Sequence, residues 1–183
     1  MLDELKQRVC EANLALGRAG LVQWTFGNVS GIDRATGNVV IKPSGVDYAV
    51  MQPSDMVVVA LDTGKVVEGA LRPSSDTPTH LELYRAWGDV GGVAHTHSLY
   101  ATAWAQARRE LPPLGTTHAD YFHGAVPCTR LLTPEEIDAD YEANTGKVIV
   151  ERFGRLNHRA VAAVLVADHR SEERRVGKEC RSR

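Results

Sequence analysis

The stretch that decides the fold spans residues 91–98 and reads Gly-Gly-Val-Ala-His-Thr-His-Ser. It has the pattern of a short buried strand that ends at His95-Thr96-His97 and passes at once into a helix running to about residue 109. Side chains alternate between the faces of a strand, so His95 and His97 point the same way. Ser98 suits the N-cap of that helix. Two imidazoles on one face, at the carboxyl end of a strand, predict half of a metal site.

A histidine pair of this kind is more often unrelated to metal, so the prediction needs a third ligand. Catalytic zinc usually takes three protein ligands and leaves one position open for water or substrate. One candidate is His169, which closes the apolar run 162–167, read here as a buried strand. The other is Asp76, which precedes a helix and is explained as simply by capping. Both candidates stay open on the sequence alone.

Length and composition indicate one globular domain. The chain has 183 residues, of which 43% are hydrophobic, enough to bury a sizeable core. No apolar run approaches the length that spans a bilayer, and the N-terminus lacks a signal-peptide pattern. The three cysteines, Cys10, Cys128 and Cys180, are few and unpatterned, which fits a reducing compartment. We therefore expect a cytoplasmic protein with no membrane partner.

The last stretch, residues 170–183, differs from the rest and reads RSEERRVGKECRSR. Without its six basic and three acidic residues, 15 basic (21 less 6) and 20 acidic (23 less 3) remain, a net charge of −5. An acidic body argues against a nucleic-acid partner, although the basic tail imitates a nucleic-acid arm. The tail resembles translated sequencing-adapter DNA. We expect one domain over residues 1–169 and a non-native tail over residues 170–183.

The remaining patterns mix helices and strands. Periodicity predicts an amphipathic helix over residues 5–16, a helix from about residue 77 to 87, a capping-box helix start at residues 133–136, and a helical stretch at 147–156. Strands are predicted within residues 22–29 and 38–41, and a β-hairpin joins 56–61 to 65–68. Strict βαβ alternation is missing, so a layered α/β/α or α+β fold is favoured over a Rossmann sheet.

Three segments carry groups suited to a ligand. Gly27, inside a strand pattern, indicates either a close backbone approach to a ligand or an ordinary bulge. Residues 42–45 combine a lysine, a serine and a glycine in a turn, and Ser74-Ser75 precede a helix, so each segment can bind an anion. Residues 115–121 crowd polar groups between apolar segments, which fits either acid/base work or a capped loop.

Five runs carry a resemblance to a known family: TFGNVSGID, VIKPSGVDY, PSSDTPTHLELY, VAHTHSLYATAWAQ and GTTHADYFHG. They resemble the class II aldolase and ribulose-phosphate epimerase family, and most closely its L-ribulose-5-phosphate 4-epimerases. The likeness runs from residue 1 to about residue 169. It implies an α/β fold of three layers, α/β/α, around a central mixed, largely antiparallel sheet.

The resemblance also implies a site. His95, His97 and His169 match the zinc-binding histidines, and Asp76 matches the carboxylate beside the metal; manganese or cobalt can replace zinc at such sites. Asp120 matches an acid/base residue that reaches the active site of a neighbouring subunit in a homotetramer. The positions that match substrate-binding residues, the serines mostly serving the phosphate of a sugar phosphate, are Gly27, Asn28, Lys42, Ser44, Gly45, Ser74, Ser75 and Thr116.

The implied reaction interconverts L-ribulose 5-phosphate and D-xylulose 5-phosphate. The C4 proton is not acidic, so the family cleaves the C3–C4 bond in a retro-aldol step and then re-forms it. Aspartate at position 76, where related aldolases carry glutamate, favours the epimerase over a zinc aldolase. A non-enzymatic binding module is the alternative from another class. Family members continue past the last zinc histidine to a tyrosine that partners Asp120, so the chain as written is expected to be impaired. Arabinose and ascorbate catabolism both use the reaction.

Overall fold

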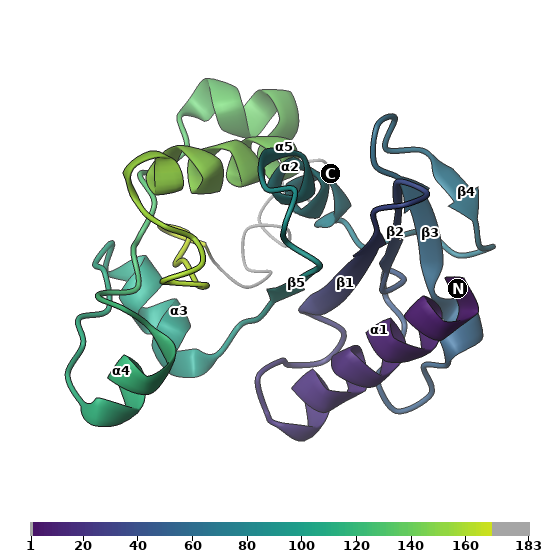
Figure 1. The fold of residues 1–183 in the computed structure, drawn as a ribbon, viewed down its shortest axis with the longest axis horizontal. Helices are drawn as coiled ribbons and strands as arrows, with labels where there is room; N and C mark the ends of the chain where they lie inside the picture. The colour runs from purple at the N-terminus through teal and green to yellow at the C-terminus, as the bar shows by residue number, and fades with distance from the viewer. Residues whose placement is uncertain (1, 170–183) are drawn as a thin grey trace, which may run out of the picture.

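The computed structural model describes residues 2–169, in which helices cover both faces of one sheet (Figure 1). The strands follow the spatial order β4-β3-β2-β1-β5, and all four pairings are antiparallel. The strands are β1 (Asn28–Asp33), β2 (Asn38–Ile41), β3 (Val57–Ala60), β4 (Val66–Glu68) and β5 (Gly92–His95). The helices are α1 (Leu2–Arg18), η1 (Pro53–Asp55), α2 (Thr77–Ala86), α3 (Leu99–Gln106), α4 (Thr116–Tyr121), α5 (Pro134–Arg152) and η2 (Phe153–Arg155).

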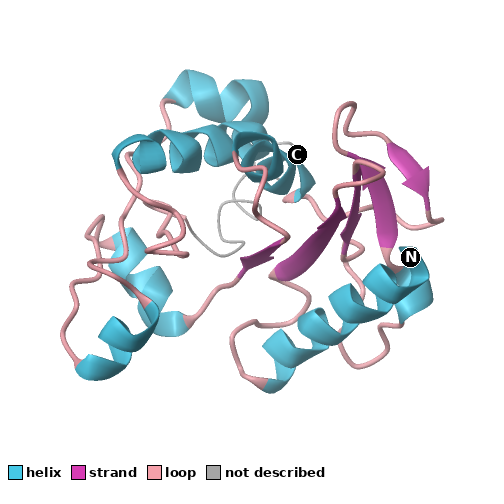
Figure 2. Cartoon of the chain, in the orientation of Figure 1, coloured by secondary structure: helices cyan, strands magenta, loops and turns pink. Residues whose placement is uncertain are grey.

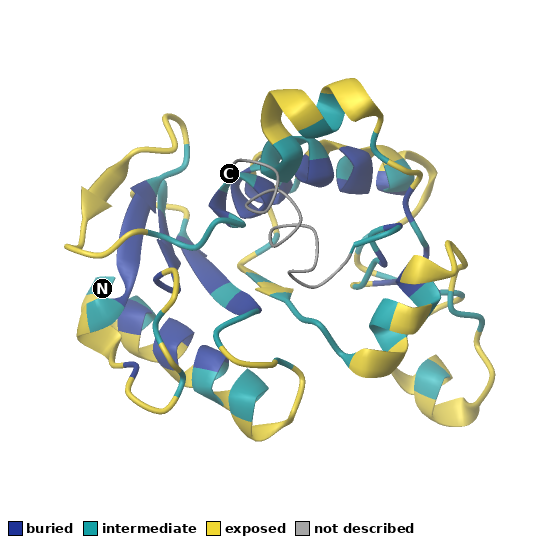
Figure 3. Cartoon of the chain, turned by 180° about the vertical axis from the view of Figure 1, so that it is seen from behind, coloured by how far each residue is buried: buried dark blue, intermediate teal, exposed yellow. Residues whose placement is uncertain are grey.

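The expected α/β/α layering is confirmed by two apolar clusters on opposite faces of the sheet. On one face, Val9 of α1 packs with Val40 and Val58. On the other, Tyr84 of α2 packs with Val39. The neighbouring valines of β2 serve different faces because strand side chains alternate. Helix α5 then lies against α2, and the buried residues concentrate in the sheet and the helix surfaces that face it (Figure 3).

Two strand predictions need correction. Strand β5 lies at the sheet edge and its residues are exposed or half-buried, not buried as expected. The apolar run 162–167 is no strand: its ladder is one isolated bridge, between Leu165 and Cys128. The bridge consists of two hydrogen bonds: Leu165 N donates to Pro127 O, and Thr129 N donates to Leu165 O. Apolar composition alone predicted burial there correctly for Leu165, but a strand also needs a neighbour to pair with.

The other boundaries shift for local reasons. The first helix, the strand at 38–41, the hairpin and the capping box at Thr133 are confirmed, whereas β1 begins only at Asn28. Residues 116–121 form the short helix α4 in place of a loop. The expected mixed sheet is antiparallel throughout the described residues. The predicted non-native tail lies outside those residues.

Helix α5 replaces two predicted helical stretches and contains a break at Asp140. Asp140 has φ −161° and ψ 89°, and its carboxylate accepts a hydrogen bond from the backbone of Ala143 at 3.1 Å. This is the geometry of an N-cap, so Asp140 starts the second half of the helix. Consequently Tyr141 stands at the beginning of a new helical segment.

Helices α3 and α4 form a lobe beside the sheet, linked largely by loops (Figure 2). Its own apolar cluster joins Ala105 of α3 to Val126, Val161 and Leu165. The segment that ends at His169 packs on this lobe through Leu165, and on the apolar cluster of α2 and α5 through Val164 and Val166. Within residues 2–169, no helix combines the length and apolar character that a membrane span requires.

Gly146 sets the approach of α5 to α2 and gives a first prediction. A Cβ at Gly146 would lie 2.6 Å from Glu82 Cβ and 3.0 Å from Thr79 O. We expect Gly146→Ala to lower the free energy of unfolding by roughly 1 kcal/mol or more, because the overpacking cost exceeds the gain in helix propensity. Chemical denaturation measures the change.

Gly154, in η2 directly after α5, supplies the matched control. A Cβ there meets nothing within 4 Å. Gly154→Ala should leave the unfolding free energy within about 0.5 kcal/mol of the parent value, as surface substitutions usually do. Equal effects of the two substitutions would show that the α2–α5 contact is not close-packed.

Candidate metal centre

Three imidazoles meet where β5 ends. His95 is the last residue of β5, His97 follows two residues later, and His169 arrives from the other lobe. His95 Nε2 lies 2.8 Å from His97 Nε2 and 3.2 Å from His169 Nε2. The three residues form a group whose ligand atoms all lie within 4.8 Å of one another. The two histidines of the sequence pair thus acquire a third partner.

Local structure holds His169 in this position. Asp168, the preceding residue, has φ +55°, which turns the chain toward the other two histidines. Its carboxylate accepts two hydrogen bonds from Arg108 at 3.2 and 2.9 Å, and its backbone N–H donates to Ala105 O at 3.2 Å. Helix α3 and the turn after it therefore connect the two parts of the arrangement, because α3 begins two residues after His97, and Ala105 and Arg108 bind Asp168. Ser98, the expected cap of α3, makes no side-chain capping bond.

Burial keeps two of the imidazoles neutral. It lowers the pKa of His97 to about 4 and that of His169 to about 3, each with a smaller contribution from the nearby His95. A histidine binds metal only through a deprotonated ring nitrogen. At neutral pH these two side chains are therefore already in the form that a metal ion needs.

Asp76 stands at the N-terminus of α2, but its side chain does not cap the helix. Instead, its carboxylate accepts a hydrogen bond from Asn28 Nδ2 at 2.6 Å. Burial raises the pKa of Asp76, but His95, His80 and the Asn28 bond lower it more, so the pKa falls below its usual value. The carboxylate therefore stays ionised beside the imidazoles, and capping does not explain this aspartate.

One cavity of about 630 Å³ brings most of the predicted site together. Thr116 and Asp120 do not line it; both are exposed on α4. The predicted site residues that do line it are Gly27, Asn28, Lys42, Ser44, Gly45, Ser74, Ser75, Asp76, His95, His97 and His169.

One wall of the cavity was not predicted from the sequence. Residues 137–142 of α5 line the cavity, and the hydroxyl of Tyr141 lies 3.1 Å from Nδ1 of His169. Asp168 also lines it. No residue pattern marked this wall, because it exists only through the helix break at Asp140.

Two cavity residues are held by the backbone around them. Lys42 is buried, donates to Thr25 O at 3.1 Å and lies over the Tyr48 ring, and burial lowers its pKa to about 8. The lysine is therefore still mostly cationic at neutral pH. Gly27 has φ +73°, and a Cβ there would lie 2.9 Å from His95 O. The chain is thus crowded at this glycine by the Val22 side chain and by the backbone of β5, whereas a close approach to a ligand stays a prediction.

A family model described as the class II aldolase and adducin N-terminal domain matches residues 7–169, nearly all of the described chain. The chain belongs to the class II aldolase family. This family depends on a divalent metal ion. Ligand nitrogens at metal–nitrogen distances of about 2.0–2.1 Å in a tetrahedral arrangement stand roughly 3.3 Å apart. In this class II aldolase domain the two separations from His95 Nε2, 2.8 and 3.2 Å, lie near that value, and all the ligand atoms lie within 4.8 Å of one another.

Relatives within the family include an epimerase and aldolases. The chain is 58% identical over 168 residues to an L-ribulose-5-phosphate 4-epimerase of Salmonella paratyphi C (strain RKS4594), covering 92% of this chain and 73% of the relative. An L-fuculose 1-phosphate aldolase structure superposes with a TM-score of 0.73 at 31% identity, covering 91% and 72% of the two chains. The L-fuculose-1-phosphate aldolase of Thermus thermophilus gives a TM-score of 0.67 at 26% identity, covering 92% and 78%. The expected family and fold class are confirmed.

Acid should destabilise this fold through its buried histidines, of which His80 is the most enclosed. His80 Nδ1 lies 2.7 Å from the Ser30 hydroxyl, and burial lowers the pKa of His80 to about 4. The unfolded chain binds a proton below about pH 6.5 whereas the folded protein does not, so stability falls as the pH falls from about 6.5 toward 4. We expect His80 alone to account for roughly 2–3 kcal/mol between about pH 7.5 and 4.5.

Denaturant unfolding of the metal-free protein at several pH values measures this slope. His80→Gln should flatten it, whereas His123→Gln should not, because His123 is exposed. A slope that is identical in the parent and in His80→Gln contradicts the assignment.

Proposed function

We propose that this protein is a metal-dependent epimerase that interconverts L-ribulose 5-phosphate and D-xylulose 5-phosphate by retro-aldol cleavage and re-addition. The observation that carries the proposal is the convergence of three imidazole nitrogens with Asp76 in a chain 58% identical to such an epimerase. Aspartate at position 76 also supports the epimerase over the aldolase reaction.

In this proposal His95, His97 and His169 hold the ion, with Asp76 beside it. Three histidines with one position left for substrate are typical of catalytic zinc, and manganese and cobalt also accept imidazole ligands. The bound ion supplies Lewis-acid stabilisation of the negative charge that develops on substrate oxygens. Asn28 positions the Asp76 carboxylate through its 2.6 Å hydrogen bond. The buried Oδ1 atom of Asn28 has no hydrogen-bond partner among residues 2–169 and can accept a hydrogen bond from a substrate hydroxyl.

The phosphate end of the substrate is assigned to the other side of the cavity. Ser74 and Ser75 precede the N-terminus of α2, where backbone N–H groups and the helix dipole favour an anion. Ser44 and Gly45 contribute a hydroxyl and an open backbone turn, and Gly45 has φ +74°. Gly27 and Lys42 complete the set. These groups keep the phosphate-bearing two-carbon fragment in place while its aldehyde turns to offer the other face.

Asp120 and Thr116 act from a neighbouring subunit of a homotetramer in this account. Asp120 exchanges the proton of the C4 hydroxyl on one face of the substrate. Both residues are exposed on α4 and outside the cavity of their own chain. The neighbouring Leu114 and Tyr121 side chains are 79% and 76% exposed, an apolar surface that a second subunit can cover. The free Cys10 and Cys128 support a cytoplasmic location.

The deciding experiment supplies L-ribulose 5-phosphate to the metal-loaded protein and follows D-xylulose 5-phosphate. We expect an equilibrium mixture of the two sugars and no aldehyde caught by a trapping reagent. Steady release of a trapped aldehyde would identify the alternative, a class II sugar-phosphate aldolase, for which the 31% identical L-fuculose 1-phosphate aldolase is the precedent. Sugar-phosphate binding without either product would identify a binding module.

A further inference from the structure

Tyr141 makes a contact with the metal-site histidines that the proposed reaction does not use. Its hydroxyl lies 3.1 Å from Nδ1 of His169, and its side chain lines the cavity. The backbone of Tyr141 is well fixed: Asp140 caps the helical segment that begins there, and the Thr145 hydroxyl donates to Tyr141 O at 2.8 Å. The side chain therefore starts from a backbone position that two hydrogen bonds define.

The position of the imidazole proton decides what the contact does. Nε2 of His169 faces His95 Nε2 at 3.2 Å, so Nε2 is the atom that can share an ion with the other histidines. A neutral imidazole that gives its Nε2 lone pair to a metal carries its proton on Nδ1. Nδ1–H of His169 then donates to the Tyr141 hydroxyl oxygen. This hydrogen bond selects the metal-binding tautomer and holds the plane of the ring.

We propose that Tyr141 is a positioning residue of the metal centre, which acts by accepting the Nδ1–H of His169. The proposal rests on the proposed metal centre and adds a residue to it. His169 has particular need of such support, because it is 74 residues from His95 and arrives on a segment that forms no strand. The corresponding Nδ1 of His97 is buried without a hydrogen-bond partner among residues 2–169. Among the described residues, the Nδ1 atom of His169 therefore has a hydrogen-bond partner, whereas that of His97 has none.

Metal affinity of the metal-free protein tests the proposal without any assay of activity. Removing a hydrogen-bond partner of a metal-ligating histidine typically weakens metal binding by about 10–100-fold. We expect Tyr141→Phe to raise the Kd for Zn²⁺ by that factor, measured in competition with a chelating dye. The matched control is Tyr100→Phe, whose side chain is 79% exposed on α3 and which should leave the Kd unchanged.

A second measurement separates positioning from a structural role. The melting temperature of metal-free Tyr141→Phe should match that of the parent protein. A lowered melting temperature of the metal-free variant with an unchanged Kd would overturn the proposal.

The same titrations distinguish failure of this inference from failure of the metal centre. If the parent binds one Zn²⁺ that His97→Ala loses, while Tyr141→Phe binds as tightly as the parent, only the role of Tyr141 is wrong. If the parent binds no Zn²⁺, the metal centre and the role of Tyr141 both fail.

Discussion

Replacing His97 with alanine is expected to remove the metal ion and the enzymatic turnover together. His97 contributes one of three converging imidazoles, and its Nε2 lies 2.8 Å from that of His95. Without it, the ion keeps too few ligands in the cavity. The lost Lewis-acid stabilisation amounts to several kcal/mol, which corresponds to about a thousandfold or more in rate. Metal content per chain and the rate of D-xylulose 5-phosphate formation measure the two losses.

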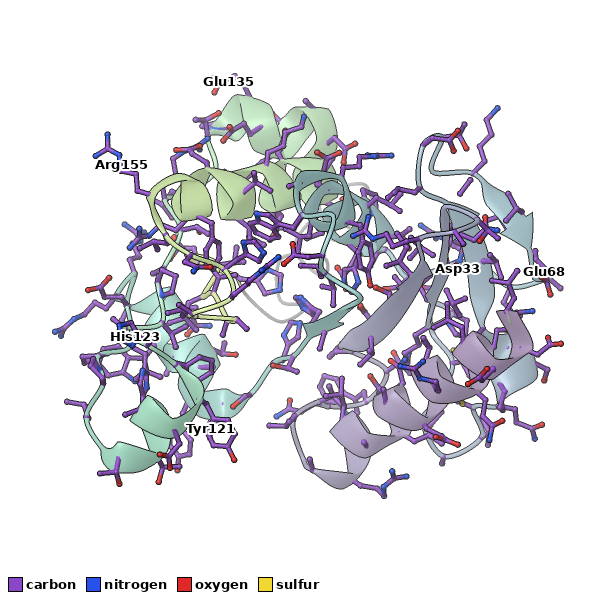
Figure 4. All side chains as sticks on the ribbon, viewed as in Figure 1. Asp33, Glu68, Tyr121, His123, Glu135 and Arg155 are labelled. Carbon is purple, nitrogen blue, oxygen red and sulfur yellow. The ribbon has the colours of Figure 1, made fainter. Side chains whose placement is uncertain are left out.

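His123→Ala is the matched control for metal content. His123 lies in the α3–α4 lobe (Figure 4), is exposed, and belongs to no group that could hold a metal among the described residues. That variant should keep its ion, and circular dichroism should show both variants folded. A folded His97→Ala protein that retains zinc and full turnover would refute the assigned centre.

Replacing Asp120 with asparagine is expected to give the second large effect, and a different one. The substitution preserves shape but removes the carboxylate that we propose as the group exchanging a proton. Asp120 is exposed, so the fold and the bound metal should be unaffected. Turnover should fall roughly a hundredfold or more, the usual contribution of one acid/base group. A near-normal rate would show that another group moves the proton.

Mixing the two variants tests whether Asp120 acts on the site of another subunit. Hybrids of His97→Ala and Asp120→Asn chains contain some sites in which an intact histidine cluster meets an intact aspartate. Random assembly from equal amounts gives roughly a quarter of sites with both groups, and hence about a quarter of the parent activity. Asp120 that serves only its own chain would give no recovery, because every chain lacks one of the two groups.

Much of the site could be predicted because its signals are local. His95 and His97 are two residues apart in the sequence, and this spacing brings their imidazoles together although β5 already ends at His95. The capping box at Thr133 is equally local, and the structure contains both of its hydrogen bonds. The third ligand was harder to predict. No sequence pattern near His169 indicates metal binding, and only the family resemblance selected it.

The rest depended on contacts between distant segments. The run before His169 looked like a strand because it is apolar, but its side chains pack on the α3–α4 lobe and on helices α2 and α5. Tyr141 was missed because a hydrogen bond between residues 28 positions apart leaves no periodic pattern. Asp76 could be read from its own sequence neighbours as a helix cap, but its carboxylate makes no capping bond and is held by Asn28. In each case a contact between residues far apart in the sequence determined the role of the side chain.

Anomalous X-ray diffraction at the zinc absorption edge, on crystals of the metal-loaded protein, tests the central claim most directly. The account predicts one peak per chain in which a single ion contacts the Nε2 atoms of His95, His97 and His169 at about 2.0–2.1 Å. A peak elsewhere, or an ion that touches only one of these imidazoles, would contradict it.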